Sequence, residues 1–417
     1  MSNKTKKYIY IQPEYVKQFK CDGSKCDAKC CSQGWNITVD SETYRKYAGI
    51  KPKSKARQII ERIEFKKQFN LNVMKLQPDG RCPFLRQDKL CSIQRRYGEG
   101  FLSETCRVYP RVAYNLINFY ERALTITCPL VAELILSPPE PMAFEQVELD
   151  EYQHLGNGTI DIPNLPRGLL EQAFTVQYAA ISILQSRNLS IDGRLIVLGF
   201  YLDRLDELIK DARLDEIEKL SAVYSSEEFL SSEAPHLING IQFDCKAYIK
   251  TMFKLLDSLY GDGAKFNQGN NRYIDAVSDA LEIAVDKNKG ASLSELVKNY
   301  ERLDSARKEF LDRHSIELEH YLVNEFFLSL YPWKLSTSIS QNYGAFVAAY
   351  KILELIGLSI EVQWKKWHAD DSEPPKDYQL PAIITNLAVN VDHSREYLQC
   401  MTDHLEGDIL SIMKGLL

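Results

Sequence analysis

Cysteine is the residue type in this sequence whose number and spacing are suited to chemistry. Eight of the ten cysteines fall in the first third of the 417-residue chain, and the other two, Cys245 and Cys400, stand alone in helical patterns. The eight are Cys21, Cys26, Cys30, Cys31, Cys82, Cys91, Cys106 and Cys128. A distribution this uneven predicts a metal or cluster site in the first third of the chain.

The spacing of the thiols limits the kind of metal site. Loops of about two to four residues let two thiolates reach one zinc or iron ion, as in the segment CDGSKCDAKCC at residues 21–31. The adjacent Cys30 and Cys31 point in different directions, which suits a multi-iron cluster or leaves one of them to pack. An iron–sulfur cluster commonly takes four thiolates. The eight cysteines could therefore form two such sites, or one site together with cysteines that have a redox or structural role. A structural zinc site is the alternative.

Other cofactor patterns are absent from the sequence. The spacing Cys-x4-Cys-x3-Cys-Cys differs from the Cys-x3-Cys-x2-Cys of common radical S-adenosylmethionine enzymes, and no dinucleotide fingerprint or P-loop occurs. None of the 7 histidines lies in the first 150 residues, which argues against a mixed Cys/His zinc finger. His154 falls in a linker and His393, beside Asp392, is typical of a helix cap, so we assign no catalytic residue.

Basic and aromatic residues follow Cys106 in the segment CRVYPR. Arg107, Tyr109 and Arg111 are suited to hold the carboxylate or phosphate of a bound cofactor, because guanidinium groups bind such anions in bidentate fashion. The same arginines could instead neutralise the charge of a cluster or form salt bridges between domains.

Length and composition indicate a folded protein of two or three domains. Hydrophobic residues make up 45% of the chain, yet no apolar run approaches the roughly 18–20 residues that span a bilayer, so no membrane association is expected. The basic N-terminal stretch lacks a continuous apolar segment, which predicts a cytoplasmic protein without a signal peptide. Cytosolic thiols are kept reduced, which favours metal thiolates over disulfides. No recognised nucleic-acid motif occurs.

The net charge of −6 is divided unevenly along the chain. Residues 1–135 hold 25 Lys and Arg against 13 Asp and Glu, which leaves 26 and 44 for residues 136–417. The two parts therefore carry +12 and −18. A lysine-rich partner could bind the acidic part, or the two surfaces could attract each other.

Around the cysteines, the sequence predicts short elements. These are a strand within 8–20, a strand-like stretch at 35–39, a helix from an N-cap at Ser41, an amphipathic helix over 54–69, a helix or strand over 114–126 and a helix over 131–137. Pro138, Pro139 and Pro141 mark the best domain boundary, and 138–166 shows few regular signals, with Gly156-Asn157-Gly158 read as a turn.

Helical periodicity dominates the rest of the chain. Helices are predicted over 168–187, 190–213, 215–223, 245–260, 271–287, 292–312, 317–331, 342–357 and 381–415, the last broken near 392, with a loop at 261–271. The fold class is therefore mostly α: a small, irregular, cysteine-rich cluster-binding domain (1–137), a linker (138–166) and an all-α domain (167–417) with orthogonal packing, suited to substrate docking.

These motifs in combination resemble a known family. The pattern Cys-x4-Cys-x3-Cys-Cys, CPFL, Cys-x-Ile, CR-x-YPR and a late Cys-Pro resembles the YkgJ-type cysteine-cluster family, described as zinc- or iron-chelating. The opening IQPEYVKQFKCDGSKCDAKCCSQGW, followed by a long helical part, looks like its flagellin lysine-N-methylase (FliB-like) branch. The motifs cover residues 9 to about 135.

The resemblance implies a protein lysine N-methyltransferase that transfers methyl groups from S-adenosylmethionine to lysines of flagellin. It also implies a [4Fe–4S] cluster whose ligands come from the eight N-terminal cysteines, with zinc as the alternative metal. Two other classes stay open from the residues: a non-enzymatic zinc- or iron-binding or redox-sensing module, and an iron–sulfur oxidoreductase.

Overall fold

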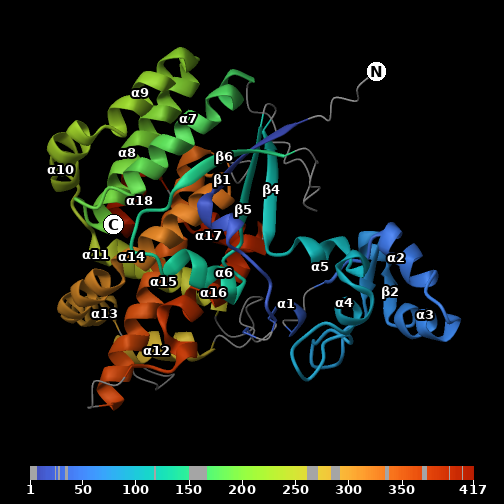
Figure 1. Cartoon of the computed structure of the whole chain (residues 1–417). Coiled ribbons are helices and arrows are strands. Elements are labelled where there is room, and N and C mark those ends of the chain that lie inside the picture. The colour runs from blue at the N-terminus through green and yellow to red at the C-terminus, as the bar shows by residue number, and fades with distance from the viewer. Residues whose placement is uncertain are drawn as a thin grey trace. The chain divides into compact units, whose positions relative to one another are not determined.

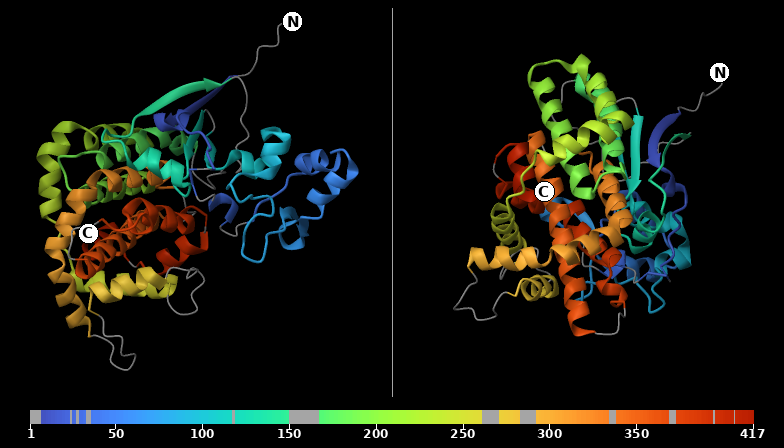
Figure 2. Two further views of the ribbon diagram at one scale, coloured as in Figure 1. Left: turned by 60° about the horizontal axis from the view of Figure 1, so that its bottom comes forward. Right: turned by 90° about the vertical axis from the view of Figure 1, so that its left-hand side faces the viewer.

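The computed structural model describes residues 7–23, 25–26, 29–32, 36–116, 119–149, 167–260, 271–282, 292–333, 338–368, 373–393, 395–405 and 407–417. The chain folds into two compact units (Figures 1 and 2). One comprises Met1–Leu134 and Ala143–Asp161, and the other comprises Ile135–Met142 and Ile162–Leu417. The strand-like residue Trp35, His154, the turn at 156–158 and most of the loop predicted at 261–271 lie outside the described residues.

A four-stranded mixed sheet forms part of the first unit. Its strands are β1 (Tyr8–Pro13), β4 (Arg111–Leu116), β5 (Phe119–Leu124) and β6 (Phe144–Leu149), in the order β4-β5-β1-β6 (Figure 1). Strand β1 runs parallel to β5, with Tyr10 opposite Tyr120, and antiparallel to β6, with Tyr10 opposite Val147. The strand predicted within 8–20 is confirmed. The prediction of an irregular first domain is wrong in this respect, because partners over 100 residues apart leave no local signal.

The cysteine-bearing part of this unit consists of short elements. They are η1 (Glu14–Lys17), α1 (Lys29–Ser32), α2 (Ser41–Ala48), α3 (Lys53–Ile60), β2 (Ile63–Lys66), η2 (Lys67–Phe69), β3 (Leu71–Met74), α4 (Ser92–Tyr97), η3 (Glu99–Phe101), α5 (Glu104–Val108) and α6 (Pro129–Leu136). Their core gathers Ile37, Val39, Tyr47, Ile50, Ile59, Met74 and Ile93 around the buried Cys82. A thiol therefore lies among the apolar side chains that hold these elements together.

Three local predictions differ from this structure. The N-cap of α2 is Asp40 rather than Ser41, since its carboxylate accepts the backbone N–H of Thr43 at 2.8 Å. The helix predicted over 54–69 ends at Ile60, because β2 and β3 pair as a hairpin. By contrast, β4 and β5 pair antiparallel, so the strand alternative within 114–126 was the correct one. Around Ile37, only the single bridge of Thr38 with Val73 forms.

The second unit is helical, and the prediction of a mostly helical chain is confirmed. Its helices are α7 (Arg167–Leu184), α8 (Ile191–Lys210), η4 (Leu214–Glu216), α9 (Ile217–Tyr224), η5 (Phe229–Glu233), α10 (Ala234–Asn239), α11 (Cys245–Tyr260), α12 (Asn271–Ala280), α13 (Leu293–Arg302), α14 (Asp304–Leu328), α15 (Ile339–Trp367), η6 (Lys376–Tyr378), α16 (Leu380–His393), α17 (Arg395–Asp403) and α18 (Ile409–Leu416). Among the described α-helices of this unit, only the short α10 lacks a sequence prediction. No helix in the described parts of the chain is long and apolar enough to cross a membrane.

Helix α15 is the centre of this unit (Figures 1 and 2). It begins after Ser338, whose hydroxyl accepts the backbone N–H of Gln341 at 3.2 Å, and it is buried without interruption from Asn342 to Ile360. It packs against α8, α12, α14, α16, α17 and α18. A long helix that is mostly apolar and buried on all sides belongs in the middle of a bundle, which is the position that α15 occupies.

Four charged side chains meet between α8, α14 and α15, where Lys351 and Glu354 are buried and Asp192 and Arg307 are partly buried. Lys351 donates to Asp192 at 2.7 Å and to Glu354 at 2.9 Å, and Arg307 donates to the same two carboxylates. Burial alone would raise the pKa of Asp192, but the neighbouring Lys351 and Arg307 hold it below its usual value. Two cations and two anions thus form a neutral buried network that joins three helices.

The proline-rich segment after α6 is held by side chains of the helical unit. Arg187 donates to the carbonyl oxygen of Pro139 at 2.6 Å, and the ring nitrogens of His320 lie 2.6 and 2.9 Å from the carbonyl oxygens of Ile135 and Glu140. Gln185 donates to the carbonyl oxygen of Met142 at 3.1 Å. Prolines lack N–H groups and cannot continue a helix, so the carbonyl oxygens of this segment have no helical N–H partners. Side chains of the helical unit hydrogen-bond to these carbonyl oxygens instead.

Candidate functional site

The eight N-terminal cysteines all belong to the first unit, and all are free thiols. Cys30 and Cys31 lie on α1, Cys91 directly precedes α4, Cys106 lies on α5 and Cys128 directly precedes α6. The segments are joined at the backbone, since the N–H of Cys82 donates to the carbonyl oxygen of Cys31 at 2.7 Å. The tertiary fold therefore brings together cysteines that the sequence spreads over 108 positions, from Cys21 to Cys128.

Cys30 lies at the centre of this group. Its sulfur is 4.0 Å from that of Cys31, and its charge acts on thiols of every other segment. Those thiols are Cys21, Cys31, Cys82, Cys91, Cys106 and Cys128. Coulombic effects of this kind fall off over a few ångströms to about 10 Å, so the thiols share one neighbourhood.

Burial and mutual repulsion govern the ionisation of these thiols. Burial, helped by neighbouring thiols, raises the pKa of Cys82 to about 11 and that of Cys106 to about 12. Burial likewise raises the pKa of Cys128 to about 11. The pKa of Cys30 is lowered, first because of its side-chain hydrogen bond with Cys31. A bound metal would have to displace protons from most of these groups.

The donor set fits a thiolate-bound metal or cluster. Zinc and iron–sulfur sites are commonly built from cysteine sulfurs, and this neighbourhood offers several of them and no histidine. Among the described residues, however, no three Cys, His, Asp or Glu side chains converge on a single metal position. The donor chemistry of the group is thus compatible with a metal or cluster, and both the bound group and its ligands among the eight cysteines are proposals.

The three residues expected to hold a cofactor are placed differently from one another. Burial and the neighbouring Cys30 and Cys26 raise the pKa of Cys21, and the positive charge of Arg111 partly opposes this rise. The guanidinium of Arg111 lies 5.3 Å from the ring centre of Phe19. The hydroxyl of Tyr109 is 3.1 Å from that of Thr127. Arg107 is exposed in the last turn of α5. Only Arg111 has a described electrostatic link to the cysteine group.

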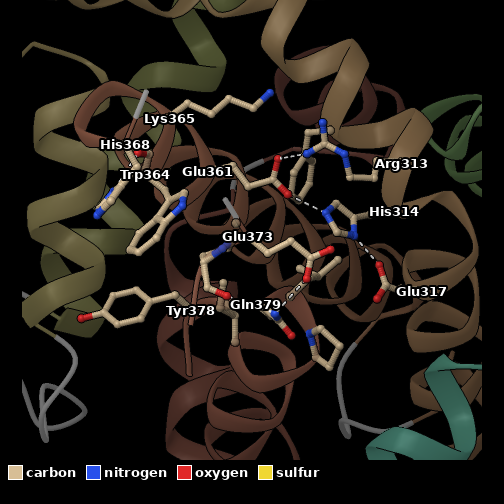
Figure 3. A pocket seen from close by; sticks show the side chains of 16 residues that line it. Arg313, His314, Glu317, Glu361, Trp364, Lys365, His368, Glu373, Tyr378 and Gln379 are labelled. Carbon is tan, nitrogen blue, oxygen red and sulfur yellow. Dashed lines mark hydrogen bonds and ion pairs between the residues drawn. The ribbon is translucent and has the colours of Figure 1, made fainter. Parts of the chain in front are cut away.

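A second site, which the sequence did not indicate, is a cavity of about 490 Å³ in the helical unit (Figure 3). Helices α14, α15 and α16 and the segment before α16 contribute its walls. It is lined by Phe310, Arg313, His314, Glu317, Gly357, Glu361, Trp364, Lys365, His368, Glu373, Pro374, Tyr378, Gln379, Leu380, Pro381 and Ile383. Its volume lies in the range of small-ligand sites, which is about 300–1,000 Å³.

A histidine between two carboxylates forms one wall of this cavity. His314 contacts Glu317 through Nδ1 and Glu361 through Nε2, the latter at 2.6 Å, and Arg313 donates to the other oxygen of Glu361 (Figure 3). Burial alone would lower the pKa of His314, but the hydrogen bonds and charges of the two carboxylates raise it to about 9. The imidazole is therefore cationic at neutral pH. Only the His314–Glu317 spacing was visible in the sequence; Glu361 is contributed by another helix.

This raised pKa predicts a pH-dependent stability. A folded pKa above the unfolded value of about 6.5 gives stabilisation that is complete below pH 6.5 and is lost as the pH rises through about 9. We expect the free energy of unfolding to fall by about 1–3 kcal/mol over that interval. Urea unfolding monitored by helical circular dichroism at a series of pH values measures it. His314→Gln should remove this part of the pH dependence. If the free energy of unfolding of this variant depended on pH as before, groups other than His314 would be responsible.

Comparison with known proteins gives the family. The model of the FliB lysine N-methylase C-terminal domain matches residues 177–417, which is more than half of the chain. The chain belongs to this family. The match takes in every described α-helix from α8 to α18, together with the cavity and the buried charge network, while the eight cysteines precede it.

Curated relatives of this FliB-type chain come from Salmonella. The chain is 28% identical over 270 residues to the Lysine-N-methylase of Salmonella typhimurium and, over the same length, to that of Salmonella choleraesuis. The match covers 64% of this chain and 64% of each relative, so it spans less than two thirds of their length. The Flagellar biosynthetic protein FliU of Salmonella muenchen is 34% identical over 141 residues, 33% of this chain and 83% of that protein. No solved structure matches the chain.

Proposed function

We propose that this chain is a cytoplasmic, S-adenosylmethionine-dependent protein lysine N-methyltransferase that acts on flagellin. The observation that carries the proposal is membership of the FliB lysine N-methylase family together with two relatives named Lysine-N-methylase. The name of a third relative, Flagellar biosynthetic protein FliU, supports a flagellar substrate.

The cysteine group is the proposed site of a [4Fe–4S] cluster. Its motifs resemble those of the YkgJ-type cysteine-cluster family, and the eight thiols of the first unit form the ligand pool. When bound, the cluster would supply an open iron position for the amino and carboxylate groups of S-adenosylmethionine. The positive charge of Arg111, which reaches Cys21, is suited to a carboxylate held at that place.

The reaction sets requirements for the lysine that is methylated. The N–C bond forms as the C–S bond of the sulfonium breaks, and the products are a methylated amine, S-adenosylhomocysteine and a proton. The amine must be neutral to attack, although the pKa of a free lysine is about 10.4. Carboxylates beside the reacting amine would raise that pKa further. The excess of acidic residues in residues 136–417 is therefore better suited to docking a lysine-rich partner than to the methyl transfer itself.

Co-expression with flagellin tests the proposal. We expect the intact mass of flagellin to increase in steps of one methyl group in cells that express the chain, and peptide mapping should locate these groups on lysines. Flagellin from cells without the chain is the control. An unchanged flagellin mass, with folded chain and S-adenosylmethionine present, would contradict the proposal.

Metal analysis separates this function from the two rival classes. Iron together with acid-labile sulfide in anaerobically purified protein is expected for the methyltransferase and also for an iron–sulfur oxidoreductase. Stoichiometric zinc without iron would favour a zinc-binding or redox-sensing module. The mass of flagellin then distinguishes the methyltransferase from the iron–sulfur oxidoreductase, since only the methyltransferase increases it.

A further inference from the structure

The cavity of the helical unit has no part in the chemistry described above. Phe310, Leu380 and Ile383 give it an apolar surface, which is called the apolar floor below, and ionised groups and aromatic rings complete its lining. Figure 3 labels the ionised and aromatic residues. Such a combination is typical of a site for an amphipathic ligand. The charged groups and aromatic rings of the lining indicate the charge and chemical class of this ligand.

The ionised groups around the cavity cancel one another, with one exception. The cations His314 and Arg313 are paired with the carboxylates of Glu317 and Glu361. Lys365 is paired with Glu309 at 3.4 Å. Glu373 is left without a cation among the described residues, since its carboxylate contacts only the amide of Gln379, at 3.5 Å. Glu373 is therefore the one carboxylate of the lining that has no cationic partner among the described residues.

Aromatic faces add to the attraction for a cation. One face of Trp364 is stacked on His368, with ring centres 3.7 Å apart, and the indole lines the cavity. Tyr378 lines it too, and its ring already attracts the guanidinium of Arg272, 5.1 Å away. Figure 3 shows Trp364 and Tyr378 on the side opposite His314 and Glu317, with Glu373 between them. Indole and phenol rings attract cations through their negative faces.

We propose that this cavity binds a lysine side chain of the protein substrate, with the ammonium between Glu373 and Trp364 and the methylenes on the apolar floor. A monocation with an apolar stem matches a single free carboxylate and an apolar surface. A zwitterion such as S-adenosylmethionine matches less well, because the cations around the cavity already have carboxylate partners. The choice of lysine over other amphipathic cations rests on the proposed function. Because Glu373 would keep the amine protonated, the bound lysine is a docking residue and not the one that is methylated.

Fluorine NMR of the full chain labelled with 5-fluorotryptophan tests this site directly. The chain has 4 tryptophans, so the resonance of Trp364 can be assigned by its loss in Trp364→Leu. We expect Nα-acetyl-L-lysine amide to shift this resonance in a saturable manner, and Nα-acetyl-L-norleucine amide, which lacks the ammonium, to have no such effect. Trp367, three residues further along α15 and 64% exposed, does not line the cavity, so its resonance should stay in place.

Variants then measure the contributions to affinity. Glu373→Gln should weaken binding of the lysine amide about two- to fivefold, the range of an exposed ion pair, and Trp364→Leu, read by calorimetry, about 3- to 30-fold. Trp367→Leu is the matched control and should bind normally. Equal shifts with the norleucine amide, unchanged affinity in Glu373→Gln, or displacement of the lysine amide by S-adenosylmethionine would overturn the proposal. Lysine binding without flagellin methylation would contradict the proposed function alone; methylation without lysine binding would contradict this inference alone.

Discussion

Replacing Lys351 by methionine is expected to lower the free energy of unfolding of the helical unit by about 3–5 kcal/mol. The side chain of Lys351 is 2% exposed and donates to both Asp192 and Glu354. Its removal leaves the buried carboxylate of Glu354 and the partly buried one of Asp192 with Arg307 as their only cation in the network. The lost attraction is large because the desolvation cost of both carboxylates stays in place. Denaturant unfolding at neutral pH, followed by circular dichroism, gives the value.

The same helix provides the matched control for this experiment. Lys366 forms an ion pair with Asp279 at 3.4 Å, but its side chain is 57% exposed. Lys366→Met should therefore change stability by less than about 1 kcal/mol. The double variant Lys351→Met/Glu354→Gln restores one cation to one anion and should recover part of the loss, which a double-mutant cycle quantifies. Equal effects of the two single lysine variants would show that burial of the network does not matter.

Replacing Cys30 by serine is expected to abolish iron retention and to slow flagellin methylation by more than about 100-fold, because changes to residues that only support metal ligands already cost about 10–100-fold. Cys30 is chosen because its charge reaches thiols of all the other cysteine segments described above. The measurements are iron and acid-labile sulfide per chain, and methyl groups per flagellin after a fixed time.

Two cysteines outside the group serve as controls. Cys245 begins α11 and Cys400 lies on α17, both in the helical unit, and both are only partly buried. Cys245→Ser and Cys400→Ser should keep iron, sulfide and methylation at the level of the unaltered chain. A folded Cys30→Ser chain that retains full iron and sulfide would show that Cys30 is not a ligand, whereas an unaltered chain purified without iron and sulfide would refute the proposed cluster.

Much of the helical unit could be predicted from the sequence, and the first unit could be predicted only in part. Helices are held by hydrogen bonds within a few residues, so periodicity and caps were sufficient for α7, α8 and α11. The sheet of the first unit pairs Tyr10 with Tyr120 and Val147, and such distant partners leave no pattern in either segment. The hairpin of β2 and β3 was not predicted either, because the charged residues of β2 also fit the pattern of an amphipathic helix over 54–69.

The candidate sites divide in the same way. The sequence alone predicted a thiolate site, because eight cysteines lie in the first third of the chain and no histidine lies near them in sequence. Sequence also supplied the family resemblance, which the match to residues 177–417 supports for the helical part. The expected thiolate site and the family resemblance both rest on residue types and on short spacings along the chain. These are properties of the sequence and do not depend on how the chain folds.

Only the tertiary structure decided which groups meet. It placed Cys30 within electrostatic reach of Cys128, 98 positions away in sequence, and set Glu361 beside His314 across two helices. Among the described residues, it also gave Glu373 no cationic partner, in a cavity whose walls come from separate helices. Such neighbours are fixed by the packing of apolar faces and not by spacing along the chain. The thiol group was therefore visible in the sequence, whereas the histidine between two carboxylates and the cavity beside it were not.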